Sequence, residues 1–241
     1  MLDKEKPILF STPMVQSLDF KTATRRVMNP QPVMDEDGMW LWKDCQWMDG
    51  GLGFPQSGID DHARYQPGDI LWVRETWSFW PCWDCDNDCN SHKVWYRDSD
   101  GCFVYKAQRK KVPHEDRWRP SIFMPKEAAR IFLRVTDVRA ERLQDISEAD
   151  AKAEGIKSYW LTKEAGKNAD DWHDSNGPPF IGAAKELGAD LCFTRREAYQ
   201  QLWDCLNAKR DGGKYAWDKD PWVWVIEFER CAKPQGWPEV A

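Results

Sequence analysis

Short apolar runs, rather than long amphipathic segments, decide what this chain can fold into. Runs typical of β-strands stand at residues 7–10, 20–27, 70–77, 131–138 and 222–228. They combine β-branched and aromatic residues, which favour a pleated and partly buried backbone. Helix signals are confined to residues 12–18, 147–155 and 194–206, where capping-box pairs or a first-turn proline precede the helical pattern. The sequence therefore predicts an α+β fold, a small closed β structure with helices around it.

Three long irregular stretches separate these runs, at about residues 29–66, 78–120 and 157–192. Loops of this length are uncommon in a compact domain and are usually functional or disordered. Nine of the 16 tryptophans lie in or near them, and that much aromatic area argues against disorder. We therefore expect residues 1–241 to form a single elaborated domain that carries three insertions.

Composition and charge narrow the class of protein. The chain has 41% hydrophobic residues, 31% charged residues and a net charge of −6, which is ordinary for a soluble globular protein and argues against a surface coated in phosphate-binding charge. No apolar run reaches the length of a membrane helix, and the first residues lack the features of a signal peptide. We expect a cytoplasmic protein with no membrane partner, whose eight cysteines are thiols or metal ligands rather than disulfides.

One cysteine cluster has the composition of a metal site. Cys82, Cys85, Cys89 and His92 provide four soft ligands within eleven residues, and such a set could hold a tetrahedral zinc ion that stabilises an insertion without a core of its own. The spacing is tighter than in usual zinc fingers, so free thiols in a polar loop are the alternative. Any zinc here would be structural, and no cofactor is expected to be required for catalysis.

The segment around Lys21 and Thr24 carries a second candidate chemistry. A threonine hydroxyl is a poor nucleophile until a base removes its proton. A lysine is such a base only when neutral, so its usual pKa of ~10.4 must fall by roughly 2–3 pH units through burial or nearby positive charge. Arg25 and Arg26 could supply that charge. Lys21 must then precede the strand, with Thr22, Thr24 and Arg26 on one face; the alternative is that all are ordinary surface residues.

Four motifs in order resemble the ASCH domain, a member of the PUA-like β-barrel superfamily. The matching segments are residues 20–26, 68–73, 146–155 and 225–228. The first is similar to the family's G-x-K-x-x-E/T-x-R signature, with Asp19 where glycine is usual, and the third to a helix that ends in A-x-x-E-G/N. Residues 118–125 also look like larger ASCH-type proteins of phages and prophages. The resemblance implies a small closed PUA-like barrel with peripheral helices, and the insertions lie outside it.

One branch of this family, the N(4)-acetylcytidine amidohydrolases, carries a catalytic set that matches this chain. By motif position, the resemblance implies that Lys21, Thr24 and Glu154 are the catalytic residues. Thr24 would attack the acyl carbonyl, Lys21 would move the proton to the leaving amine, and Glu154 would orient or charge Lys21. The implied function is hydrolysis of an acyl amide on a modified pyrimidine, with a cytidine-type nucleoside as partner.

Four further residues are candidates for substrate binding. Arg26 and Arg74 could face a phosphate or a base edge, and Trp72 or Trp77 could stack on a base. The alternative for the tryptophans is a place in the core. The alternative function is a non-catalytic module that binds RNA, DNA or a modified base, with single-stranded nucleic acid as partner. A ribonuclease, as some ASCH proteins resemble, has no histidine pair or carboxylate cluster to support it.

Overall fold

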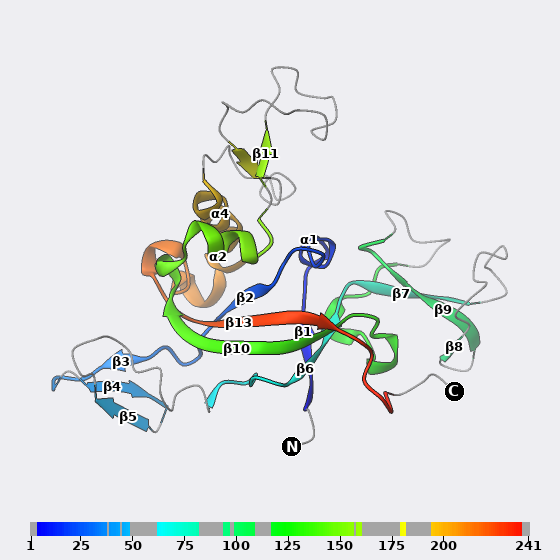
Figure 1. Cartoon of the computed structure of the whole chain (residues 1–241), viewed down its shortest axis with the longest axis horizontal. Coiled ribbons are helices and arrows are strands. Elements are labelled where there is room, and N and C mark those ends of the chain that lie inside the picture. Colours follow the sequence, from blue (N-terminus) through cyan, green and yellow to red (C-terminus); the bar gives the residue numbers. More distant parts are fainter. Residues whose placement is uncertain are drawn as a thin grey trace. The chain divides into compact units, whose positions relative to one another are not determined.

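The computed structural model divides the chain into two compact units (Figure 1). The first comprises Met1–Asp19, Pro67–Val135 and Phe228–Ala241, and the second comprises Phe20–Gln66 and Thr136–Glu227. The structure describes residues 4–37, 39–43, 45–48, 62–81, 94–96, 99–108, 117–156, 158–160, 179–181 and 194–237. Two long strands, β10 (Phe132–Arg142) and β13 (Trp222–Cys231), contribute residues to both units.

The first unit is built on three neighbouring strands. β6 (Ile70–Arg74) lies between β1 (Glu5–Leu9), to which it is parallel, and the start of β10, to which it is antiparallel. A separate antiparallel sheet has the order β7-β9-β8, with bounds Trp77–Pro81, Ser99–Tyr105 and Val94–Tyr96. The short elements of this unit are α1 (Thr12–Gln16), η3 (Ser121–Phe123) and η4 (Lys126–Ala128).

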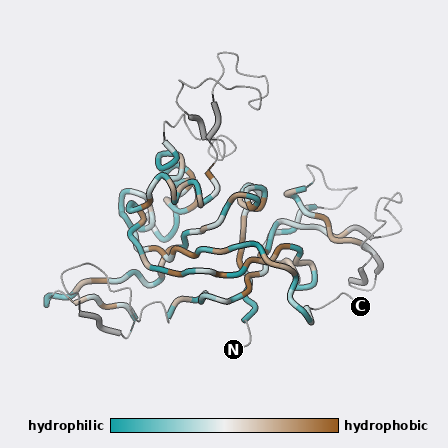
Figure 2. Tube along the Cα trace, in the orientation of Figure 1, coloured by the Kyte–Doolittle hydropathy of each residue, from teal (hydrophilic) through white to brown (hydrophobic). Residues whose placement is uncertain are grey.

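The position of β6 explains its sequence. Ile70, Leu71, Trp72 and Val73 are all buried, so both faces of the strand are covered, and a continuous apolar run is needed rather than alternation. Gly68 lies in the turn just before β6 and has a backbone φ of +91°, a conformation that residues with a Cβ rarely adopt. Figure 2 shows hydrophobic residues recurring along the strands, whereas much of α2 and α4 is hydrophilic.

The second unit pairs β2 (Ala23–Val27) with β13 in antiparallel register, and β10 is the other neighbour of β13. Two helices, α2 (Glu148–Ala153) and α4 (Arg195–Asn207), lie on one side of these strands (Figure 1). Their apolar side chains form a core with Val223 and Val225 of β13. The remaining strands form two small sheets, β3 (Val33–Met34), β4 (Met39–Trp42) and β5 (Cys45–Met48), and β11 (Ser158–Trp160) with β12 (Pro179–Ile181). Short 3-10 turns are η5 (Leu143–Asp145), η7 (Arg210–Gly213) and η8 (Trp217–Lys219).

Both predicted capping boxes are present. Ser147 and Asp150 close the start of α2 reciprocally, as Thr194 and Glu197 do for α4. α2 ends at Ala153, and Gly155 follows the C-cap residue Glu154. The φ of Gly155 is +94°, and its N–H donates to the Lys152 carbonyl at 2.9 Å. This glycine-terminated end satisfies carbonyls that the helix itself cannot pair.

The coarse fold prediction is confirmed: the protein is a mixed α+β structure with a mainly sheet core and few helices. The small closed barrel stays a prediction. The three stretches expected to be irregular, at about residues 29–66, 78–120 and 157–192, contain strands: β3–β5 in the first, β8, β9 and most of β7 in the second, and β11 and β12 in the third. Gly, Asp, Ser and Pro interrupt the alternation there, and aromatic pairs such as Phe79–Phe103, with ring centroids 5.4 Å apart, hold the strands together instead. In the part of the chain that the structure describes, no helix has the length and apolarity needed to cross a membrane.

Candidate active site

Lys21 and Glu154 form a buried ion pair in the second unit. The Lys21 Nζ donates to Glu154 Oε2 at 2.7 Å and to the Glu154 carbonyl at 2.6 Å. The two residues are only 2% and 4% exposed. The Thr22 N–H donates to the Ala153 carbonyl at 2.8 Å, so the segment before β2 is tied to the end of α2. The backbone thereby brings together two side chains that lie far apart in the sequence.

Two further donors hold the Glu154 carboxylate. An Arg25 guanidinium nitrogen lies 3.4 Å from Oε1, and the Tyr199 hydroxyl donates to the same oxygen at 3.3 Å. Arg25 is fully buried at its side chain, and Tyr199 reaches the carboxylate from α4. Glu154 is therefore fixed from three directions, with one oxygen facing Lys21 and the other facing Arg25 and Tyr199.

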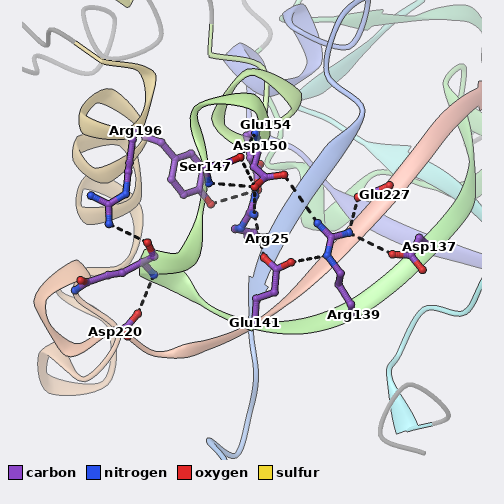
Figure 3. Close-up of polar contacts among 12 residues, drawn as sticks. Arg25, Asp137, Arg139, Glu141, Ser147, Asp150, Glu154, Arg196, Asp220 and Glu227 are labelled. Carbon is purple, nitrogen blue, oxygen red and sulfur yellow. Dashed lines mark hydrogen bonds and ion pairs between the residues drawn. The ribbon is translucent and has the colours of Figure 1, made fainter. Parts of the chain in front are cut away.

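A wider charge network surrounds Arg25 (Figure 3). Its other terminal nitrogen lies 3.2 Å from Glu141 and 3.7 Å from Asp150. Glu141 also pairs with Arg139, which contacts Glu227 in turn. Asp150 is the residue that caps α2 together with Ser147. Arg25 of β2 thus forms ion pairs with Asp150 near the start of α2 and with Glu154 at its end. These ion pairs help to hold α2 against β2.

Burial lowers the pKa of Lys21, against the opposing effect of the Glu154 charge and hydrogen bond. The positive charges of Arg26 and Arg25 lower it further. Burial and the neighbouring Glu154 charge raise the pKa of Tyr199, so its hydroxyl stays a neutral donor. The site thus favours a neutral amine more than solvent does, and it holds that amine against a carboxylate.

Thr24 lies three residues after Lys21, which places the two Cα atoms within about 10–11 Å of each other. It is 0% exposed, and its hydroxyl has no hydrogen-bond partner among the described residues. Arg25 is paired with Val225, a member of the core under the helices, whereas Thr24 is paired with Ile226. Thr24 and Arg26 therefore share the face of β2 opposite to that of Arg25. A buried hydroxyl without a partner costs roughly 1–3 kcal/mol, so the Thr24 hydroxyl destabilises the folded protein.

Arg26 belongs to the same electrostatic neighbourhood. Burial lowers its pKa, while Tyr65, Glu154 and Tyr199 act in the opposite direction and Arg210 acts in the same direction. Of the predicted residues, the structure thus brings Lys21 and Glu154 into direct contact and places Arg26 within range of the Glu154 charge. The Thr24 hydroxyl makes no hydrogen bond to Lys21 or Glu154.

The other predicted substrate-binding residues lie in the first unit. Trp72 and Trp77 are 8% and 1% exposed, and both rings are packed in its core, Trp72 against Trp237 with ring centroids 6.0 Å apart. The Arg74 guanidinium lies over the Trp72 ring at 5.4 Å and donates to the Ile122 carbonyl. Both tryptophan rings are therefore occupied by packing contacts.

The predicted zinc ligands Cys82, Cys85, Cys89 and His92 lie outside the described residues. Within the described ranges, no group of three or more His, Cys, Asp or Glu side chains is arranged to hold a metal ion. Comparisons of this chain with protein-family models, with curated proteins and with solved structures gave no match.

Two groups in the site escaped sequence reasoning. Tyr199 has the spacing of an apolar helix face, which is typical of a core residue, but its hydroxyl donates to Glu154. Asp150 has the spacing of a capping-box residue, but it also contacts Arg25. The clue in both cases is a polar atom on a side chain that the pattern buries, because such an atom needs a partner.

Proposed function

We propose that this chain is an ASCH-type amidohydrolase with a PUA-like barrel, which hydrolyses an acyl amide on a modified pyrimidine such as an N-acylated cytidine. Lys21, Thr24 and Glu154 are its catalytic set. The observation that carries the proposal is the buried Lys21–Glu154 pair with its lowered lysine pKa, three residues from a buried threonine hydroxyl that no described group engages. Perturbed titratable groups of this kind are typical of functional sites.

The first half of the proposed reaction forms an acyl-enzyme. The Lys21 amine, bonded to Glu154, must turn to the Thr24 hydroxyl, with which it makes no hydrogen bond in the structure. Once neutral, it takes the hydroxyl proton as the oxygen attacks the acyl carbonyl carbon. The tetrahedral intermediate collapses, the C–N bond breaks, and the Lys21 ammonium returns its proton to the departing exocyclic nitrogen. Glu154 stabilises the ammonium between these two transfers because its carboxylate lies 2.7 Å from Nζ.

The second half releases the acid. Water attacks the Thr24 ester, Lys21 removes the water proton, and the same proton restores the Thr24 hydroxyl as the ester C–O bond breaks. The sum of the two halves is one amide and one water converted to an amine and a carboxylic acid. General-base help of this kind contributes typically 10²–10⁴-fold.

The test is acetate release from N(4)-acetylcytidine by purified protein. We expect Thr24→Ala to abolish release, whereas Thr22→Ala, at an exposed position two residues away, retains it. For the active protein, kcat/KM should rise with pH through the lowered pKa of Lys21. Full activity in Thr24→Ala would remove the assignment, and so would the absence of release from any acylated pyrimidine offered to the unaltered chain.

A further inference from the structure

Tyr199 reaches the candidate active site from a helix outside the four segments that resemble the ASCH domain. It lies on α4, whereas Glu154 belongs to the matching segment at residues 146–155. The residue is 4% exposed, and its ring packs against Trp203 and Trp217, with ring centroids 6.2 and 6.4 Å away. These contacts account for the ring, but the hydroxyl donates to Glu154 Oε1 at 3.3 Å. The hydroxyl therefore acts on the site itself and not only on the core.

The start of α4 is fastened to α2, and this contact fixes where Tyr199 lies. The Glu148 carboxylate at the start of α2 accepts from the backbone N–H groups of Arg195 and Arg196, at 3.0 and 2.9 Å. N–H groups in the first turn of a helix have no partner within their own helix and favour an anionic acceptor. One turn later along α4, Tyr199 meets the other end of α2 at Glu154. The two helices are thus joined at both ends of α2.

The two oxygens of the Glu154 carboxylate have different partners. Oε2 accepts from Lys21, whereas Oε1 accepts from the Tyr199 hydroxyl and lies 3.4 Å from an Arg25 nitrogen. The last torsion of a glutamate side chain is broad, so donors on Oε1 help to keep Oε2 turned toward Lys21. Donors on one oxygen also draw negative charge toward it and leave less on the other oxygen. Tyr199 therefore affects both the position of the carboxylate and the strength of its bond to the Lys21 ammonium.

Tyr199 is the neutral member of the set of groups around Lys21. Burial lowers the pKa of Lys21 and raises that of Tyr199. The charges that act on both groups are those of Glu154, Arg25 and Arg26. Because its raised pKa keeps the Tyr199 hydroxyl protonated, this side chain supplies a hydrogen bond without a charge. Tyr199→Phe therefore removes the hydrogen bond and leaves every charge of the site in place.

We propose that Tyr199 is a positioning residue of the candidate active site, which acts through Glu154 on the proton affinity of Lys21. Its hydrogen bond holds the carboxylate in place and weakens the ion pair, so that the amine can lose its proton and turn to Thr24. The inference rests on the proposed amidohydrolase function, in which neutral Lys21 is the base. It adds to that function a group that works without contacting the substrate.

The pH dependence of acetate release from N(4)-acetylcytidine by Tyr199→Phe tests this role. Without the hydroxyl, Lys21 holds its proton more tightly, so the pKa that governs kcat/KM should rise by about 0.5–1 pH unit. Below that pKa, kcat/KM should fall by about 3- to 10-fold, because the neutral amine becomes rarer by that factor. KM should stay unchanged, and the two proteins should converge at higher pH. A merely structural role would instead lower activity by the same factor at every pH.

Tyr215→Phe is the matched control. Tyr215 is 1% exposed and belongs to the same unit, but its hydroxyl interacts with Lys214 and not with the Glu154 carboxylate. This variant loses the same atom from the same kind of buried ring. We expect it to keep the kinetic pKa of the unaltered chain.

The proton affinity of Lys21 is also measured without substrate, by NMR titration of the lysine side-chain nitrogens in the full chain. The Lys21 signal is assigned by its loss in Lys21→Arg. A higher Lys21 pKa in Tyr199→Phe, and an unchanged one in Tyr215→Phe, supports the proposal. The proposal is wrong if Lys21 titrates in Tyr199→Phe as it does in the unaltered chain, or at lower pH. The expected shift without any acetate release would remove the amidohydrolase function and leave the coupling of Tyr199 to Lys21 standing.

Discussion

Replacing Thr24 with valine separates the contribution of its hydroxyl to stability from its contribution to chemistry. The side chain is 0% exposed and the hydroxyl has no described partner, so the folded protein carries the desolvation cost of that group, roughly 1–3 kcal/mol. Valine has the same branched shape, suits a strand, and adds a buried methyl group worth about 0.8 kcal/mol. Together these two contributions should raise the free energy of unfolding of Thr24→Val by about 2–4 kcal/mol.

Urea unfolding followed by tryptophan fluorescence measures this difference, because the chain contains 16 tryptophans. The midpoint should rise while the slope with urea stays constant, which marks a change in stability alone. Thr22→Val is the matched control, since Thr22 is exposed and surface changes usually fall within about 0.5 kcal/mol. The same Thr24→Val protein should release no acetate from an acylated cytidine.

A gain in stability together with a loss of turnover would mark Thr24 as a residue kept for its function. If Thr24→Val is instead less stable than the unaltered protein by 1 kcal/mol or more, the hydroxyl makes a stabilising hydrogen bond in the folded state. The reasoning from an unengaged nucleophile would then be refuted, whatever the activity.

Three further changes test the surrounding structure. At pH 8, Tyr199→Phe should have a lower free energy of unfolding than the unaltered protein. This difference should narrow above pH ~10, because tyrosine ionises there in the unfolded chain while the raised pKa keeps buried Tyr199 neutral. Parallel urea titrations across alkaline pH measure the difference. Arg130→Met strands the carboxylate of Glu75, which is 1% exposed, and should cost about 3–5 kcal/mol. Because burial already raises the pKa of Glu75, this deficit should shrink as pH falls and the carboxyl protonates, and adding Glu75→Gln should recover part of it. Gly155→Ala should cost roughly 1–2 kcal/mol, since φ is +94° and a Cβ is strained there, as thermal melts would show.

Local patterns predicted the strands of the five-stranded sheet and the helices α1, α2 and α4, and missed the strands of the three smaller sheets. The strands around β6, β10 and β13 follow from apolar runs, and α2 and α4 follow from their capping residues, because these signals act within a few residues. The contact between Lys21 and Glu154 could not be read locally, since it depends on how α2 packs beside β2. Only the resemblance to a family placed them together beforehand.

The sequence left the role of Trp72 undecided and did not reveal several elements, in each case for a physical reason. Trp72 was compatible with either stacking on a ligand or packing in a core, because a large aromatic ring satisfies both patterns, and only the tertiary contacts with its neighbours distinguish them. Strands β7 and β9 were missed because their stability comes from pairing with each other and not from an alternating pattern. The 3-10 turn with exposed Phe123 carried no periodic signal at all.

The charge contacts at the two ends of α2 couple the folding of this six-residue helix to the pKa of Lys21, whose amine contacts Glu154. Asp150 near its start and Glu154 at its end both contact Arg25. Local fraying of this helix would remove two anions from around one guanidinium and leave Lys21 without its counter-ion. The proposed amide hydrolysis should therefore be lost on mild warming before the sheets melt, and amide hydrogen exchange in residues 148–154 should rise at the same temperature.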